Sequence, residues 1–306
     1  MTGVAVHYLP ASATDANRLA ACLAVPAHEI SMHTFPDGEL RVSAWPAPAV
    51  CILYAALDRP NDKLLALLFA AESLRRNGSS RLVLVAPYLC YMRQDTAFHP
   101  GEAISQKVVG QLIASRFDRV ITVDAHLHRT ARLRDVFPGI ETDNLSAMPA
   151  IASHLRANAI DPRTVIVGPD AESRPWVSEL GALLGVKFTV ARKTRLGDRS
   201  VEIALDDPQA LKGCPALLVD DIISSGGTMT SCARAVIAAG AILVDAIVTH
   251  ALFPKQLMED FNKSGIRTLR STTSVPHFTN AIALDRLLAD ALRPELIANR
   301  NEEKFS

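Results

Sequence analysis

Apolar and polar residues alternate along the chain in two rhythms. Short, nearly continuous apolar runs are typical of buried parallel strands, and longer segments with apolar residues every three or four positions are typical of amphipathic helices. Strands are predicted at residues 4–9, 28–35, 39–44, 50–56, 81–86, 119–123, 164–167, 186–191, 201–205, 216–219, 241–249 and 267–271. Helices are predicted at 14–25, 61–78, 104–115, 145–157, 178–184, 232–239, 255–264 and 281–292. This alternation indicates an α/β fold with parallel, doubly wound sheets.

Two stretches of the first half resemble stretches of the second. Residues 83–87 (Val-Leu-Val-Ala-Pro) resemble 165–169 (Val-Ile-Val-Gly-Pro), and 120–124 (Val-Ile-Thr-Val-Asp) resemble 216–220 (Ala-Leu-Leu-Val-Asp). Matches this short also arise by chance, but their common order favours an internal duplication.

The duplication and the chain length together predict two tandem domains, residues 1–145 and 146–306. After its aspartate the first copy continues Ala-His-Leu-His, whereas the second continues through a Gly-Gly pair. We therefore expect only the second domain to cradle a sugar phosphate.

Composition narrows the function classes. Apolar residues make up 49% of the 306 residues. The 32 basic residues balance the 32 acidic ones, so no net positive charge that would attract nucleic acids or membrane surfaces is expected. The five cysteines are scattered and odd in number, which is typical of a reducing compartment. The first residues lack a basic and apolar leader pattern, and no apolar run approaches about 18 residues. A soluble cytoplasmic protein is expected.

The most informative stretch is 216–230. Asp220 and Asp221 stand at the predicted end of a buried strand, and a small-residue loop precedes the next helix; it comprises Ser224, Ser225, Gly226, Gly227 and Thr228. Glycines allow close backbone approach to a phosphate, and a helix N-terminus attracts anions. The carboxylates could accept from sugar hydroxyls or hold magnesium. Taken singly, the acids also fit a solvated strand end and the glycines an ordinary turn; together they favour a sugar-phosphate site.

This stretch resembles the ribose-phosphate signature of the ribose-phosphate pyrophosphokinase (PRPP synthetase) family. The resemblance implies two tandem domains of the type I phosphoribosyltransferase fold. It also implies transfer of a diphosphoryl group from Mg-ATP to ribose 5-phosphate, with Asp220, Asp221 and the loop 224–228 holding the sugar phosphate. Four further motifs follow in family order, and their form is closer to the shorter, archaeal-type members.

Two of these motifs are implied to bind ATP. Residues 35–39 (Phe-Pro-Asp-Gly-Glu) resemble the family's nucleotide-binding turn, and 91–95 (Tyr-Met-Arg-Gln-Asp) with 98–105 resemble its second nucleotide segment. An aromatic face and carboxylates suit an adenine edge, and an arginine fork suits a phosphate. Without a functional role, the first motif would be an ordinary hairpin turn and the second a solvated loop. The implied contacts are Phe35, Asp37, Gly38, Glu39, Arg93, Gln94, Asp95 and, in some members, His99.

Metal and catalytic residues rest on the same resemblance. His126 and Asp170 match the family's metal-contacting histidine and aspartate, implying Mg²⁺ as cofactor, although magnesium ordinarily prefers oxygen ligands. The basic segment 191–199 resembles the catalytic loop, so Lys193 and Arg195 are implied to stabilise the transferring phosphates, with Arg195 also near ribose 5-phosphate. A solvated hairpin would have similar composition.

The expected reaction converts ATP and ribose 5-phosphate to phosphoribosyl pyrophosphate (PRPP) and AMP, in a homo-oligomer built from dimers with no nucleic-acid or membrane partner. Two alternatives stay open. A type I phosphoribosyltransferase that consumes PRPP would share the acids and the Gly-Gly loop, and a non-catalytic regulatory homologue would keep the fold.

Overall fold

The computed structural model describes residues 3–127, 129–195 and 201–302, without the side chains of 193–195, 201–202 and 298–302. Its helices are α1 (Ala13–Leu23), α2 (Pro60–Arg76), α3 (Ser105–Ala114), α4 (Met148–Ala157), α5 (Arg174–Leu184), α6 (Gly227–Ala238), α7 (Leu257–Lys263) and α8 (Asp285–Glu302). Its strands are β1 (Val4–Tyr8), β2 (Ala27–Glu29), β3 (Ser31–Thr34), β4 (Leu40–Ser43), β5 (Val50–Tyr54), β6 (Arg81–Val85), β7 (Arg119–Val123), β8 (Glu141–Leu145), β9 (Val165–Gly168), β10 (Phe188–Arg195), β11 (Val201–Leu205), β12 (Pro215–Ile223), β13 (Leu243–Ala251), β14 (Ile266–Thr272) and β15 (Asn280–Ile282).

The chain divides into two units. Unit 1 comprises residues 1–145, 274–276 and 284–306, and unit 2 comprises 146–273 and 277–283. Residues 284–306, expected in the second domain, thus belong to unit 1. The reason is that α8 packs along α1 and carries Glu295, which binds arginines of β6 and β7.

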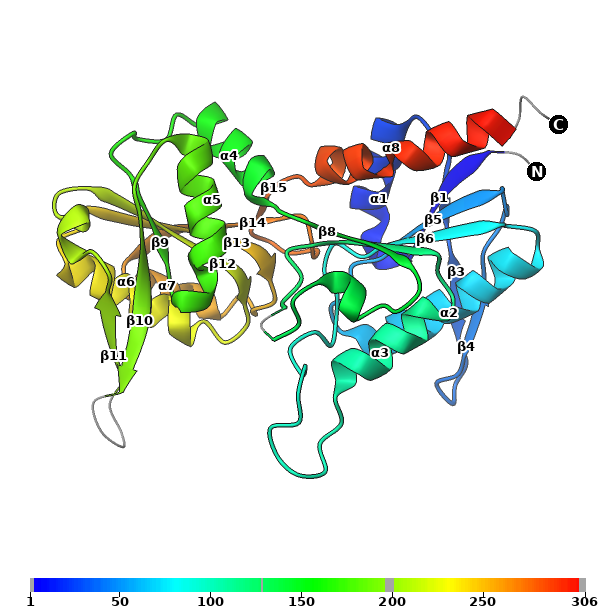
Figure 1. The fold of residues 1–306 in the computed structure, drawn as a ribbon, viewed down its shortest axis with the longest axis horizontal. Coiled ribbons are helices and arrows are strands. Elements are labelled where there is room, and N and C mark those ends of the chain that lie inside the picture. Colours follow the sequence, from blue (N-terminus) through cyan, green and yellow to red (C-terminus); the bar gives the residue numbers. More distant parts are fainter. Residues whose placement is uncertain (1–2, 128, 196–200, 303–306) are drawn as a thin grey trace. The chain divides into compact units, whose positions relative to one another are not determined.

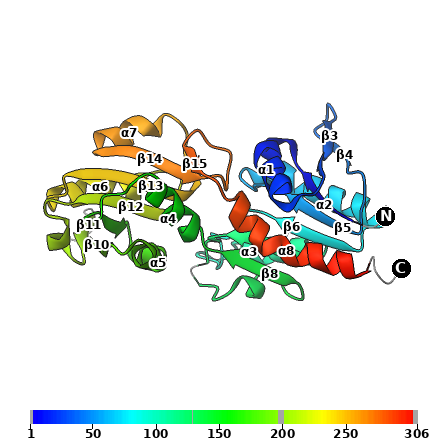
Figure 2. The same cartoon turned by 90° about the horizontal axis from the view of Figure 1, so that it is seen from above.

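Unit 1 contains a six-stranded sheet in the order β2-β1-β5-β6-β7-β8, with every pair parallel. Helices α1 and α8 cover one face and α2 and α3 the other (Figures 1 and 2). The strands are nearly all apolar and buried, as strands covered on both faces should be. A separate two-stranded hairpin, β3–β4, packs against α2.

Unit 2 contains a seven-stranded sheet in the order β11-β10-β9-β12-β13-β14-β15. Only the β10–β11 pair is antiparallel among the strand pairs that the structure describes here. Helices α4 and α5 lie on one face, and α6 and α7 lie on the opposite face (Figure 2). The expected α/β, doubly wound architecture is therefore present in both units.

The order of elements is the same in the two units, and it corrects the sequence-based pairing. In each unit the sheet begins with a strand, a helix and a second strand, and the chain then continues on the other side of the first strand; in unit 2 the helix α4 precedes this series. By this order β12 is equivalent to β5, and β9 is equivalent to β1. The short sequence matches instead paired β12 with β7 and β9 with β6, so those matches do not mark equivalent strands.

Several boundaries also differ from the prediction. Strands β8 and β15 were not predicted, because β8 is largely polar and β15 has only three residues. The predicted strand 28–35 is two strands, β2 and β3. Strand β12 continues through both aspartates to Ile223, and α6 begins at Gly227 instead of residue 232.

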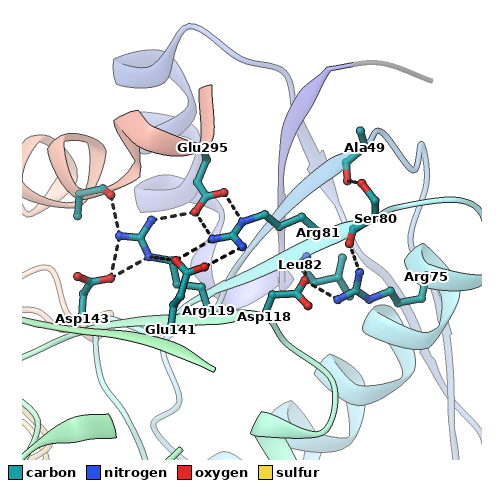
Figure 3. Close-up of polar contacts among 11 residues, drawn as sticks. Ala49, Arg75, Ser80, Arg81, Leu82, Asp118, Arg119, Glu141, Asp143 and Glu295 are labelled. Carbon is teal, nitrogen blue, oxygen red and sulfur yellow. Dashed lines mark hydrogen bonds and ion pairs between the residues drawn. The ribbon is translucent and has the colours of Figure 1, made fainter. Parts of the chain in front are cut away.

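A network of buried ion pairs fastens α8 to the sheet of unit 1 (Figure 3). The Glu295 carboxylate accepts hydrogen bonds from Arg81 Nε (2.5 Å) and from Arg119 Nη1 (2.8 Å). Arg119 also donates to the Asp143 carboxylate and to the Ala291 carbonyl of α8. The Glu295 side chain is only 3% exposed, so these are strong, poorly screened contacts.

Candidate functional site

The strand order of unit 2 reverses between β9 and β12. From β9 the chain moves outward through β10 and β11, and from β12 it moves outward in the other direction. Ligands of open α/β sheets bind at such a switch point, beyond the carboxyl ends of the strands. Asp170 follows β9, and Asp220 and Asp221 lie near the end of β12. The fold therefore gathers three predicted site residues at one point.

Asp170 and Asp221 lie close enough to Asp220 to raise its pKa. Burial first, then the charges of Asp221, Asp170 and Glu172, raise the pKa of Asp220 well above its usual value. Asp221 is buried, and its backbone N–H donates to Asp220 Oδ1 over 3.1 Å. Such repulsion is relieved when a cation or hydroxyl donors bind, so this acidic cluster is suited to a sugar or a metal-bound phosphate.

Asp170 is held by its own turn. Its side chain accepts from the backbone N–H groups of Glu172 and Ser173, which caps the short helix Ala171–Ser173. Gly168 allows this turn to pack closely, because a β-carbon there would lie 2.1 Å from Ser173 Oγ. The carboxylate is thus oriented before any ligand binds.

The predicted sugar-phosphate loop connects β12 to α6. Gly226 caps α6 with φ of +76°, a conformation that favours glycine. A β-carbon at Gly226 would lie 2.7 Å from the ring of Phe261, whereas Gly227 has nothing within 4 Å. Gly226 therefore serves the packing of the loop, and Gly227 leaves open the space that an anion at the N-terminus of α6 requires.

Phe261 is a residue that sequence reasoning missed. It is fully buried on α7, and its ring packs against the backbone of the loop at Gly226. It also packs edge-on against Phe253, with ring centroids 5.1 Å apart. No local signal connects it with the loop, because it lies 35 positions after Gly226 and looks like an ordinary core residue.

A cavity of about 310 Å³ borders the loop on the side of α7. Ser225, Gly226 and Gly227 line it together with two basic side chains, Arg234 and Lys263, and one acidic side chain, Asp260, so the basic residues outnumber the acidic one. Neither cation was singled out from the sequence, because each looks like a solvated position on a helix. Their position adds positive charge beside the loop, which favours a phosphate there.

The predicted flap is the β10–β11 hairpin of unit 2. Lys193 pairs with Ile203 and Arg195 with Val201 in its antiparallel ladder. Their side chains, like residues 196–200, lie outside the described part of the chain. The assignment of Lys193 and Arg195 as catalytic cations therefore stays a prediction.

The first predicted ATP motif forms the tip of the β3–β4 hairpin in unit 1. The Phe35 N–H donates to the Glu39 carbonyl (2.8 Å), the Gly38 N–H to the Phe35 carbonyl (2.9 Å), and the Glu39 N–H to Asp37 Oδ1 (3.1 Å). Gly38 has φ of +93°, which the turn requires. Phe35 as a whole residue is 39% exposed, although its ring contacts that of His33 with centroids 4.9 Å apart, so part of the residue is accessible to a base.

The second predicted ATP motif lies in the connection between β6 and α3, where Glu102 organises the backbone. The Glu102 carboxylate accepts from the N–H groups of Phe98 and His99 and from the Gln94 side-chain amide (3.0 Å). Arg93 and His99 are exposed.

Asp95 differs from the other predicted ATP contacts. Its carboxylate is only 2% exposed and accepts from both the Arg129 backbone N–H and the Arg129 guanidinium (3.0 Å). This geometry favours a structural role for Asp95, which ties two loops of unit 1 together, over direct contact with ATP.

The predicted metal pair is divided between the units, with His126 after β7 in unit 1 and Asp170 in unit 2. Among the residues that the structure describes, no three His, Cys, Asp or Glu side chains are grouped to hold a metal ion. A metal at Asp170 or His126 would therefore need oxygen ligands from a substrate.

Both halves of the chain match known domain families. Residues 5–116 match the N-terminal domain of ribose phosphate pyrophosphokinase, and residues 141–285 match the phosphoribosyl transferase domain. No helix in the described part of the chain is long and apolar enough to cross a membrane.

Whole proteins with this name are similar over most of their length. The ribose-phosphate pyrophosphokinase of Methanobrevibacter smithii is 32% identical over 272 residues, which cover 85% of this chain and 90% of that protein. That of Methanopyrus kandleri is 30% identical over 84% and 88%, and that of Maricaulis maris 32% over 86% and 84%. Archaeal relatives are among the most similar, but bacterial ones reach the same identity.

A solved structure shows the same fold. Phosphoribosylpyrophosphate synthetase from Mycobacterium smegmatis superposes with a TM-score of 0.82 at 23% identity, covering 95% of this chain and 98% of that one. The agreement extends over both units.

Proposed function

Because the chain belongs to the ribose-phosphate pyrophosphokinase family, we propose that it transfers the β,γ-diphosphoryl group of ATP to the 1-hydroxyl of ribose 5-phosphate, giving PRPP and AMP. The observation that carries the proposal is the acidic cluster of Asp170, Asp220 and Asp221, gathered beside a glycine loop at the switch point of unit 2. The full-length similarity to enzymes of this name supports the same reaction.

The substrates divide between the motifs as follows. The loop 224–228 holds the 5-phosphate at the N-terminus of α6, and Asp220 and Asp221 accept hydrogen bonds from the ribose hydroxyls. Phe35 stacks on adenine, and Asp37 and Glu39 face its amino group. Arg93 and Gln94 bind the rest of the nucleotide.

In the reaction, the ribose O1 forms a bond to the β-phosphorus of ATP. The bond from that phosphorus to the oxygen bridging it to the α-phosphorus breaks, and AMP leaves with that oxygen while the hydroxyl proton is released. Lys193 and Arg195 stabilise the charge that develops on the transferring group, which is the main requirement in phosphoryl transfer.

Mg²⁺ fits this site as a cofactor bound with substrate. Asp170, whose carboxylate is held by the N–H groups of Glu172 and Ser173, supplies one hard oxygen ligand, and phosphate oxygens of the substrates and water supply the others. His126 is assigned to the same role by its family motif. When bound, Mg²⁺ neutralises phosphate charge; Asp220 and Asp221 keep their orientation toward the sugar hydroxyls.

Two alternatives are less well supported. A phosphoribosyltransferase that consumes PRPP needs no N-terminal domain of the kind matched by residues 5–116. A non-catalytic homologue could dispense with the acids and cations of the site, yet Asp170, Asp220, Asp221 and Lys193 are all present.

The assembly proposed is a homo-oligomer. In unit 1, Leu65 and Phe69 on α2 are 49% and 44% exposed, and Val108 and Leu112 on α3 are 59% and 39% exposed. Apolar side chains of this size, one turn apart on helices that cover the same face, suit a contact with a second copy. Light scattering on the purified chain tests this. All five cysteines are unpaired, which supports a cytoplasmic location.

A direct assay tests the reaction. The purified chain is incubated with Mg²⁺, ATP and ribose 5-phosphate, and AMP and PRPP are quantified by chromatography. Both products should form in equal amounts and only when ribose 5-phosphate is present. Release of pyrophosphate from PRPP with a nucleobase, without AMP formation from ATP, would instead establish the phosphoribosyltransferase.

A further inference from the structure

Unit 2 has a second cavity, at the amino edge of its sheet. Its volume is about 280 Å³, and it lies among the first residues of β12, β13 and β14 and the end of α4. Apolar side chains line part of it, including Leu155, Ile160, Pro215 and Leu243, and two guanidinium groups, Arg267 and Arg270, line another part.

The Asp245 carboxylate pairs with one of the two guanidinium groups, that of Arg267. Asp245 accepts from Arg267 Nε (3.0 Å) and Nη2 (2.6 Å) and from Thr268 Oγ1 (2.8 Å). These bonds, and the nearby charge of Arg270, lower the pKa of Asp245 against the effect of burial. The other acid that lines the cavity, Asp161, is already bound to Arg163 by its side chain and backbone.

A positive charge is therefore left over. Two arginines and two aspartates line the cavity, but Asp161 is already paired with Arg163, which lies outside the lining, and Asp245 is paired with Arg267. Arg270 is therefore the lining cation that forms no hydrogen bond or ion pair with the described residues. Arg270 is half-buried. A guanidinium group that lines a cavity without a carboxylate partner offers its N–H groups to an anionic ligand.

The charge of Arg270 also affects the pKa of His154 on α4. Burial, and then the charge of Arg270, lower the pKa of His154, and its buried Nε2 has no hydrogen-bond partner within the described ranges. The histidine is thus held neutral beside an arginine whose charge is not matched.

We propose that this cavity binds a small organic anion, one acidic group on an apolar body, with the acidic group on Arg270 and the body against the leucine and proline side chains. A carboxylate matches the planar fork of a guanidinium, and the apolar lining favours a carbon body over a bare inorganic ion. We call it the amino-edge site.

The amino-edge site is separate from the sugar-phosphate loop. Leu217 lines it, whereas Asp221 belongs to the acidic cluster at the other end of β12. The two positions are four residue steps apart along the strand, about 13 Å at ~3.3 Å per residue. A ligand of the amino-edge site should therefore bind together with ribose 5-phosphate and not compete with it.

Benzoate is a suitable probe, because its neutral isostere benzamide has the same shape. Titration of the full chain by calorimetry should show saturable binding of benzoate, at least tenfold weaker binding of benzamide, and at least tenfold weaker binding of benzoate to Arg270→Gln. Saturating ribose 5-phosphate should leave benzoate affinity unchanged. Arg293→Gln is the matched control, since it removes an exposed arginine paired with Asp290 in unit 1.

A second measurement needs no variant. Burial is the main cause of the lowered pKa of His154 and the charge of Arg270 is the second. Benzoate on Arg270 offsets this second cause, so the His154 pKa followed by NMR should be higher with benzoate than with benzamide. Equal affinity of benzoate and benzamide, competition with ribose 5-phosphate, or an unmoved His154 would each overturn the proposal. Equal binding of inorganic phosphate and benzoate would refute the role of the apolar lining. None of these results depends on diphosphoryl transfer.

Discussion

Two carboxylates, Glu295 in unit 1 and the half-buried Asp220 in unit 2, have pKa values that are shifted in opposite directions. In unit 1 the Glu295 carboxylate lies between Arg81 and Arg119, and these bonds lower its pKa although burial alone would raise it (Figure 3). In unit 2 the Asp220 carboxylate lies near Asp170, Asp221 and Glu172, and its pKa is raised. The first charge has its partners inside the chain, and the second is surrounded by like charges.

This difference in pKa distinguishes an acid that stabilises the fold from acids that are suited to binding a ligand. A buried ion pair whose partners are all protein groups contributes to holding the fold, whereas a buried carboxylate among other carboxylates lowers stability until something binds it. In unit 1 the Glu295 carboxylate holds α8 against the sheet. In unit 2 the carboxylates near Asp220 are suited to binding a ligand.

The equivalent loops differ in the same way. In unit 2 the loop after β12 is Ser-Ser-Gly and leads into the open N-terminus of α6. In unit 1 the connection after β5 is Ala-Ala-Leu-Asp-Arg, its first three residues are buried, and Lys63 binds the Asp58 carboxylate at 2.6 Å near the start of α2. The loop at this position is therefore accessible to an anion in unit 2, whereas the equivalent connection in unit 1 is filled by its own side chains.

The largest expected effect comes from breaking the network of unit 1. Glu295→Ala leaves Arg81 and Arg119 without their buried partner, so the free energy of unfolding should fall by about 3–5 kcal/mol in urea titrations. Asp290→Ala, which removes an exposed pair with Arg293, should change it by less than about 1 kcal/mol. Equal losses in both variants would contradict the distinction.

The same network predicts a pH dependence. Because the pKa of Glu295 is lowered by folding, its contribution is complete above its ordinary value near 4.5 and is lost as the pH falls through the lowered value. Glu295→Gln should therefore remove part of the acid sensitivity of unfolding below about pH 4.5, as measured by urea midpoints from pH 3 to 7.

Lys193 tests whether the chemistry depends on unit 2. Lys193→Ala should lower kcat by roughly 10²- to 10³-fold while the dissociation constant for ATP changes only a few fold, because a flap cation acts mainly in the transition state. Lys187→Ala, an exposed lysine just before the same strand, should leave both unchanged. A matching loss of ATP affinity in Lys193→Ala would make this residue a substrate anchor.

Asp220 tests whether a carboxylate placed near other carboxylates lowers the stability of the ligand-free protein. Asp220→Asn removes like-charge repulsion, so the ligand-free protein should melt at a higher temperature at pH 7. The KM for ribose 5-phosphate should rise roughly 10- to 100-fold, with the KM for ATP nearly constant. The stabilisation should disappear at acid pH, where Asp220 of the parent is protonated. A destabilised variant would place Asp220 among the structural acids.

The smallest effect concerns the loop itself. Gly226→Ala forces a β-carbon onto Phe261 at positive φ, so stability should fall by about 1–3 kcal/mol and the KM for ribose 5-phosphate should rise. Gly227→Ala meets nothing within 4 Å and should leave the melting temperature unchanged. If both variants melt alike, Phe261 does not support the loop.

The sequence predicted the architecture well where periodicity was strong. The buried strands β5, β6 and β7 and the helices α2 and α3 were found within a few residues, because their apolar patterns are long and regular. The polar edge strand β8 and the three-residue β15 were missed, since pairing with a neighbour, and not local composition, makes them strands.

Local motifs and distant contacts fared differently in the candidate site. The acids, the Gly-Gly pair and the Phe35 turn could be found, because each is a contiguous string with a distinct chemistry. Phe261 and Arg234 could not, because their relation to the loop exists only after α6 and α7 pack on the sheet. Asp95 was assigned to ATP from its motif, whereas its bond to Arg129 comes from folding.

The return of α8 to unit 1 has a consequence for synthesis on the ribosome. Arg119 is made 176 residues before its partner Glu295, an interval of about 9–35 s at ~5–20 residues per second. Unit 2 is complete at residue 283, when unit 1 still lacks α8, so that Arg81 and Arg119 have no Glu295 to bind and α1 lacks the helix that packs along it. The half of the protein that is translated first is therefore the half that is completed last.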